Sequence, residues 1–266
     1  MTMNVHHLNC GTMRPFAWPG GLVCHVLLIG SAAGLVLVDS GYGLADIADP
    51  KHRLGLTRPA LKPVLDENET AFRQVERLGF DPKDVRHIVV THFDGDHIGG
   101  LVDFPWAKVH VTAAEFNAAT NPQGFVEKYR YNPLIWAHGP DLVQHATAAG
   151  DRWRGFASAK ELTEIDTGIV LIALPGHTRG HAAVAVDAGD RGIFHAGGRF
   201  EHRCQIDSSA KIPFVAKQSE AMMAVDKSLV AQNHARLREL WETDSAEVLL
   251  VNGHDPGLFE RARQGV

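Results

Sequence analysis

A short stretch of the chain, residues 91–100, holds four side chains that can bind a metal ion. Its sequence is Thr-His-Phe-Asp-Gly-Asp-His-Ile-Gly-Gly, and the four side chains are His92, Asp94, Asp96 and His97. Imidazole and carboxylate groups are common protein ligands of zinc and of similar divalent ions. A glycine between them permits the tight turn that brings neighbouring side chains to one point. The stretch therefore predicts a metal site.

Two later stretches also place histidines beside glycines. His177 and His181 lie in the sequence Pro-Gly-His-Thr-Arg-Gly-His at 175–181, and His254 follows Asn-Gly near the end of the chain. A single histidine after a strand is usually a capping or surface residue. Three such stretches, each after a predicted strand, favour one composite metal site.

The elements that must position these residues are predicted from the apolar pattern. Apolar runs predict strands over 22–29, 34–38, 87–90, 108–112, 168–174, 182–186, 192–196 and 247–251. Amphipathic helices are predicted over 66–79, where Asp66 and Glu69 resemble a capping box, and over 219–241, with a break near 232–233 compatible with the pattern. Residues before 22 are expected to be irregular, and 42–65 to form a long loop with one short helix. Strands followed by helices, twice, predict an α/β fold with two sheets face to face and helices outside, a four-layer αββα sandwich.

Composition limits the class of protein. The chain has 266 residues, 45% of them hydrophobic, and a net charge of -5, so we expect a single domain over 1–266 that acts on a small molecule. No nucleic-acid partner and no membrane attachment are expected. Three cysteines without paired spacing, and no secretory leader, predict free thiols and a cytoplasmic protein. The sequence leaves the oligomeric state open.

Residues 120–160 differ from the rest of the chain, because aromatic side chains alternate there with prolines and glycines. This composition suits an inserted lid or substrate loop. The alternative is that the aromatic side chains simply cover a sheet.

Taken together, the metal-capable residues resemble those of the metallo-β-lactamase-fold hydrolases, and the resemblance covers most of the chain. The family pattern is HxHxDH after a strand, a later histidine beside a glycine, a strand-end aspartate and a final histidine. The matching residues are His92, Asp96, His97, His177 and His254. The resemblance implies one ion held by His92, Asp94 and His177 and a second held by Asp96, His97 and His254. It also implies that Asp39, after the second strand, supports the site without binding metal.

The sequence departs from the family pattern at two positions. Asp94 replaces the second histidine of the motif, and Gly198 stands where the family has an aspartate that bridges the two ions. The predicted ligand set still contains two carboxylates, so we expect two divalent ions. Weak occupancy of one of the two sites is the alternative. Zinc is expected first, while the oxygen ligand at 94 shifts preference toward manganese or iron. Arg199 is expected either to steer an anionic substrate or to disfavour a second cation, and the alternative is an ordinary solvated arginine at the surface.

The expected chemistry is hydrolysis, because a bound divalent ion lowers the pKa of its water to about 7 and supplies hydroxide. Asp96 is the expected catalytic residue, with His181 and His195 as candidates for assisting the leaving group or supporting the site. The general layout is closest to the lactonase-like branch, which predicts a lactone or related carboxylic ester as substrate. Two alternatives stay open: a metal-binding or ligand-binding protein with little turnover because of Gly198, and a di-iron redox protein suggested by Asp94.

Overall fold

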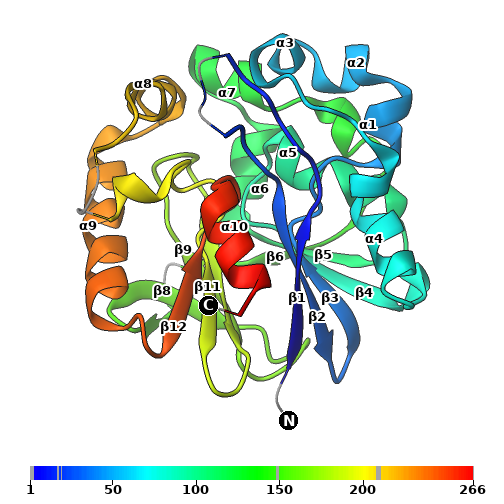
Figure 1. Ribbon diagram of the computed structural model, residues 1–266. Coiled ribbons are helices and arrows are strands. Elements are labelled where there is room, and N and C mark those ends of the chain that lie inside the picture. Colours follow the sequence, from blue (N-terminus) through cyan, green and yellow to red (C-terminus); the bar gives the residue numbers. More distant parts are fainter. Residues whose placement is uncertain (1–2, 17, 19, 148–149, 208–210, 266) are drawn as a thin grey trace.

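Two β-sheets lie face to face, and helices cover their outer faces (Figure 1). The computed structural model describes residues 3–265 except 17, 19, 148–149 and 208–210. Over this part of the chain each sheet has six strands. The predicted αββα sandwich is therefore confirmed.

The first sheet brings the end of its third strand beside the end of its fourth. It contains β1 (Asn4–Asn9), β2 (His25–Ser31), β3 (Gly34–Val38), β4 (Val85–Val89), β5 (Lys108–Thr112) and β6 (Asp141–His145), side by side in chain order. β1 to β3 are antiparallel neighbours, whereas β3 to β6 run parallel. Because the carboxyl ends of parallel strands meet at one edge of a sheet, the loops after β3 and β4 are neighbours.

The second sheet delivers three more loops to the same end of the molecule. Its strands, in chain order, are β7 (Asp151–Trp153), β8 (Phe156–Glu161), β9 (Ile169–Ala173), β10 (Ala182–Asp187), β11 (Gly192–His195) and β12 (Val248–Val251). β11 and β12 are parallel, and the other neighbours are antiparallel. The loops after β9, β11 and β12 therefore approach the loops of the first sheet.

Ten α-helices are assigned among the described residues. They are α1 (Leu44–Ala48), α2 (Pro50–Leu54), α3 (Thr57–Leu61), α4 (Ala71–Arg77), α5 (Gly95–Ile98), α6 (Ala113–Thr120), α7 (Gly124–Arg130), α8 (Phe214–Met223), α9 (Lys227–Thr243) and α10 (Pro256–Arg263). Short 3-10 turns occupy Glu67–Glu69, Pro82–Asp84, Gly99–Asp103, Pro133–Ile135 and Arg203–Gln205. Helices α1 to α3, α7 and α8 gather at one end of the sheets, at the top of Figure 1. None of the described helices is both long and apolar enough to cross a membrane.

The apolar strands bury both of their faces. Successive side chains of a strand point to opposite sides of the sheet. In β2, Leu27 and Ile29 pack between the two sheets, while Val26 and Leu28 join the core under the helices. A strand covered on both sides reads as a continuous apolar run, which is why most strands were predictable from sequence.

The structure differs from the sequence predictions where local pattern and tertiary pairing disagree. β1 was predicted to be irregular, but its backbone pairs with β2 although its residues are largely polar. The last long helical stretch breaks at 224–226 and not near 232–233, because the Asp226 carboxylate accepts hydrogen bonds from Ser228 N and Leu229 N and starts α9 anew. The Asp66 carboxylate caps only a 3-10 turn, and Thr70 caps α4. The loop predicted over 42–65 holds three short helices.

The segment 120–160 is only in part an insertion. Its positions 148–149 lie outside the described residues. From 141 onward it supplies β6 to the first sheet and β7 and part of β8 to the second, whereas 124–130 forms α7. The prolines and glycines of this segment lie in turns between short strands. Because the turns are frequent, the composition of the segment is that of a loop although part of it is strand. Cys10, Cys24 and Cys204 are free thiols, as predicted.

Candidate metal centre

Three groups of metal-capable side chains are found among the described residues, and two of them contain the predicted ligands; the third is His110, His145 and Glu164. The first group is His92, Asp94 and His177, and the second group is Asp96, His97 and His254. Within each group, one donor atom of each residue lies within 4.8 Å of the others. The structure thus brings together all six residues that the sequence predicted as metal ligands, in the two predicted sets.

One turn of helix divides the 91–100 stretch between the two groups. Asp94 is the N-cap residue of α5, and its carbonyl oxygen accepts a hydrogen bond of 2.9 Å from His97 N. His92 and Asp94 precede this turn, and Asp96 and His97 lie within it. The second group is completed by His254, which comes from the loop after β12.

The second group has the donor geometry of a small-ion site. The Nε2 atoms of His97 and His254 are 3.2 Å apart, and the Asp96 carboxylate lies 3.8 and 3.7 Å from them. An ion about 2 Å from each of three donors gives separations of this size. Val23 O lies 3.1 Å from His254 Nδ1, so the Nε2 atom faces the other donors. These three residues fit a divalent ion.

Asp39 holds the second group in place from behind. Its carboxylate lies 2.7 Å from His97 Nδ1 and accepts hydrogen bonds from Thr91 N and Thr91 Oγ1. The residue adopts a left-handed backbone conformation, φ 60°, which aspartate tolerates better than most residues. Burial disfavours the charged imidazole, but the Asp39 and Asp96 carboxylates outweigh it and raise the pKa of His97 to about 9. Asp39 thus contacts a predicted ligand and is not among the donor residues of either group.

The first group is shaped by a residue that the sequence analysis missed. Arg130, the last residue of α7, is buried, and its Nη1 atom lies 2.7 Å from Asp94 Oδ2 and 2.8 Å from His177 Nε2. Burial would raise the pKa of Asp94, but the Arg130 guanidinium and His92 lower it well below its usual value. His92 Nε2 and Asp94 Oδ1 are buried and accept or donate no hydrogen bond among the described residues. The first group is therefore already neutralised by a protein cation.

Gly198 borders the first group directly. A Cβ atom placed on it would lie 2.9 Å from His92 Cε1 and 3.5 Å from His177 Nε2. A side chain at this position would thus reach the donors of the first group. Because residue 198 is glycine, it contributes no carboxylate beside His92 and His177.

Glu115 joins the two loops that carry the first group. It is buried in α6 and accepts hydrogen bonds from Phe93 N, Thr178 Oγ1, Gly180 N and Tyr131 Oη. These donors flank His92, Asp94, His177 and Arg130 in the sequence. Nothing in the local sequence around Glu115 distinguishes it from an ordinary helical glutamate, and its role follows only from the fold.

The remaining predicted residues lie near the groups but away from open space. His195 Nε2 lies 2.9 Å from His25 O, and His195 Nδ1 accepts from Gly197 N, so the backbone engages both ring nitrogens. The His181 ring is buried, with its centroid 4.8 Å from that of His92. Arg199, expected either at the surface or facing a substrate, is fully buried, and burial lowers its pKa to about 10.

An apolar cavity of about 840 Å³ opens onto the donor atoms. Asp94, Asp96, His177, His254 and Gly198 line its floor. Its walls are largely apolar and come from three regions: the loop around Trp18, helix α3, and the facing helices α7 and α8. Of these, only α7 lies in the segment predicted to cover the site.

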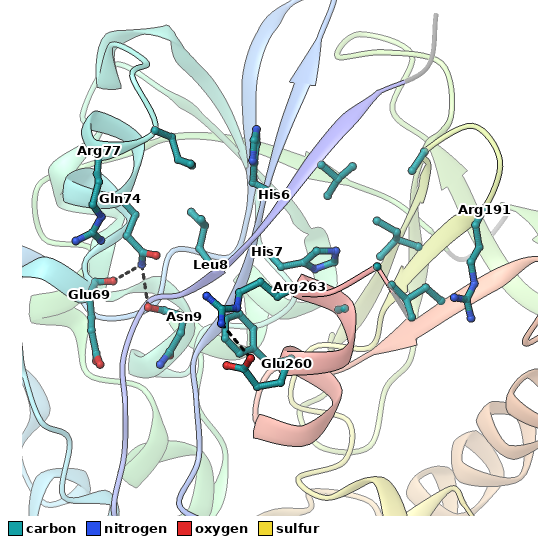
Figure 2. Close-up of a pocket in the computed structure, with 18 of the residues that line it drawn as sticks. His6, His7, Leu8, Asn9, Glu69, Gln74, Arg77, Arg191, Glu260 and Arg263 are labelled. Carbon is teal, nitrogen blue, oxygen red and sulfur yellow. Dashed lines mark hydrogen bonds and ion pairs between the residues drawn. The ribbon is translucent and has the colours of Figure 1, made fainter.

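A second cavity, of about 1000 Å³, lies beside β1 and α10 (Figure 2). It shares no lining residue with either metal group. Polar side chains there bond to the protein itself: Gln74 donates to Asn9 O and Glu69 O, and Arg263 pairs with Glu260 at 3.2 Å (Figure 2). The candidate metal ligands therefore line the apolar cavity and not this second one.

Comparison with known proteins gives a consistent result. The sequence profile of the metallo-beta-lactamase superfamily matches residues 19–197. A probable metallo-hydrolase of Mycobacterium tuberculosis is 51% identical over 261 residues, which cover 98% of this chain and 83% of that protein. The N-acyl homoserine lactonase AttM of Azorhizobium caulinodans is 28% identical over 239 residues, which cover 87% of this chain and 81% of that protein.

A solved structure shares the fold at lower identity. A variant of AiiA from B. thuringiensis, with N-decanoyl-L-homoserine bound at its active site, superposes with a TM-score of 0.67. The match is 18% identical and covers 98% of this chain and 96% of that one.

Proposed function

This chain belongs to the metallo-β-lactamase superfamily of metal-dependent hydrolases, and we propose that it hydrolyses a lactone or related carboxylic ester that carries an apolar chain. The observation that carries the proposal is the cavity of about 840 Å³, whose walls are apolar and whose floor is formed by the metal-capable side chains. A substrate that fits it has a reactive polar head and a long apolar tail.

The apolar walls explain why a tail is needed for tight binding. Phe125, Tyr129 and Met222 face the cavity from α7 and α8, and Trp18 faces it from the N-terminal loop. Burying each methylene of a tail against such walls contributes about 0.8 kcal/mol. Substrates with longer tails are therefore expected to bind more tightly than those with short ones. The relatives named as N-acyl homoserine lactonases support the choice of a lactone head.

The residues of the second group are placed for the chemical step. A divalent ion held by Asp96, His97 and His254 would supply a Lewis acid and would acidify a bound water molecule. The Asp96 carboxylate, 12% exposed, lines the cavity beside the Nε2 atoms of His97 and His254 and is placed to accept a proton from the attacking water. Asp39 keeps the His97 ring in its orientation.

Zinc is the ion that we propose for this group. Two imidazole nitrogens and one carboxylate oxygen are a donor set of zinc hydrolases, in which a fourth position stays open for water. Manganese and iron are bound by similar donors, so the ion is settled by analysis of the purified protein.

The two alternatives raised from the sequence are not favoured. The relatives at 51% and 28% identity are named as a metallo-hydrolase and a lactonase. Both names describe hydrolytic enzymes, and neither describes a redox protein or a binding protein without turnover.

The experiment is a hydrolysis assay with a series of lactones that differ only in the length of the N-acyl chain. We expect ring opening that stops on dialysis against a chelator, returns with added zinc and becomes more efficient with longer chains. His254→Ala should lose metal and nearly all turnover, because it removes one of three donors. Phe125→Ala should retain metal but flatten the dependence on chain length. Full activity of the chelated protein, or of His254→Ala, would refute the proposal.

A further inference from the structure

The first metal group contains a protein cation in contact with two of its three donors. The Nη1 atom of Arg130 lies 2.7 Å from Asp94 Oδ2 and 2.8 Å from His177 Nε2, while these two acceptors are 3.1 Å apart. Its Nη2 atom donates to Met223 O, at the end of α8. The guanidinium is thus held from three sides and buried.

We propose that Arg130 takes the place of one of the two ions, so that the chain binds a single divalent ion, at Asp96, His97 and His254. The inference rests on the hydrolysis proposed above only in that the single ion would serve that reaction. Its test measures metal content and does not depend on hydrolysis.

The first step of the argument concerns lone pairs. A metal ligand must direct a lone pair at the ion, and the nearest lone pairs of Asp94 Oδ2 and His177 Nε2 are directed at the N–H groups of Arg130. The same lone pairs cannot serve an ion while they accept these hydrogen bonds. His92 Nε2 and Asp94 Oδ1 would be left as the donor atoms without a hydrogen bond among the described residues.

The second step concerns charge. A guanidinium stays protonated at every pH at which proteins fold, so Arg130 brings one positive charge to a group that contains one carboxylate, Asp94. A dication added to this group would meet a fixed like charge at short range, in a buried place where such repulsion is strong.

The third step concerns the anion that is absent from position 198. A side chain at Gly198 would approach both His92 and His177. With glycine there, no carboxylate from this position offsets a second dication. Arg130 and Gly198 thus act in the same direction: one adds a positive charge, and the other withholds a negative one.

The second group has the opposite balance. Over the described residues, the ion pairs of Asp96 are those with His97 and His254. Its carboxylate charge is therefore available to a metal ion. The two groups, similar in residue type, differ in that the first contains a permanently charged arginine paired with its carboxylate.

The test is zinc stoichiometry. The metal-free protein is titrated with zinc against a chromophoric chelator, and bound metal is measured by mass spectrometry after gel filtration. We expect one tightly bound zinc per chain in the unmodified protein and two in Arg130→Met, which keeps the length of the side chain and removes the charge. Arg53→Met is the matched control, because the partly buried Arg53 forms an ion pair of similar length with the buried Asp46 and belongs to neither metal group; it should keep one zinc.

A second pair of variants tests the assignment if Arg130→Met does not fold. His177→Ala should still bind one zinc per chain, whereas His254→Ala should bind none tightly. Two zinc ions of similar affinity in the unmodified protein, one zinc in a folded Arg130→Met, or loss of the tight zinc in His177→Ala would each overturn the inference. One tight zinc without hydrolysis of any lactone would instead refute the proposed function and leave this inference standing.

Discussion

The conversion of Glu115 to glutamine tests whether one buried carboxylate holds the metal-bearing loops together. Glu115 lies in α6, outside every predicted motif, and accepts four hydrogen bonds from three different segments. Burial raises its pKa, while the hydrogen bonds from Thr178 and Phe93 oppose that rise. Glutamine has the same shape but only one acceptor oxygen.

The expected loss follows from which donors can adapt. The hydroxyl groups of Thr178 and Tyr131 can rotate and accept a hydrogen bond from the new amide. The N–H groups of Phe93 and Gly180 cannot, and they face different oxygens of Glu115. One of them must therefore point at an NH₂ group and stay unpaired. An unsatisfied buried donor costs about 1–3 kcal/mol, and bonds to a charged acceptor contribute about 1.5–3 kcal/mol, so Glu115→Gln should lower the free energy of unfolding by about 2–4 kcal/mol.

Urea unfolding of the metal-free protein, followed by tryptophan fluorescence, measures this loss as a lower midpoint at unchanged slope. Glu76→Gln is the control, because Glu76 is exposed and, within the described part of the chain, its ion pair is with Arg73 on the same helix; it should change stability by less than about 0.5 kcal/mol. If Glu115→Gln matched this control, the idea that Glu115 ties the loops would be wrong.

Two further predictions concern pH and backbone geometry. Burial raises the pKa of Glu201 to about 8, so the folded protein holds a proton that the unfolded chain releases near its usual pKa of 4.5. Stability should therefore fall with rising pH between about 5 and 8, by up to about 1.4 kcal/mol per unit, and thermal unfolding of Glu201→Gln should lack this part of the slope. Gly197 has φ 56°, and a Cβ atom there would lie 2.7 Å from Thr91 Oγ1. Gly197→Ala should cost about 2 kcal/mol or more, because overpacking adds to backbone strain. Gly79→Ala, with φ 87° and open space, should show the strain alone, about 1 kcal/mol, and equal losses for the two variants would count against the packing argument.

Local sequence was sufficient for most strands and for the candidate donor residues. The strand 34–38 is buried on both faces, so its residues are apolar whatever their neighbours are. The strand 108–112 was predictable because polar and apolar residues alternate in it. The donors follow strand ends beside glycines, and this arrangement is visible in the chain because it depends on residues close in sequence. The resemblance to a family then divided the donors into the two sets that the structure brings together.

The environment of the donors was decided only by the tertiary structure. Arg130 is 36 residues from Asp94 and 47 residues from His177, and no local pattern relates α7 to either loop. Likewise, the apolar cavity is built from segments that the sequence separates widely, including α3 and α8, which were not predicted to cover the site. The identities of the donor residues, and their positions after strand ends, can be read from the sequence. The charge that reaches those donors through space depends on how distant segments pack, so which group is left to bind an ion is a property of the fold.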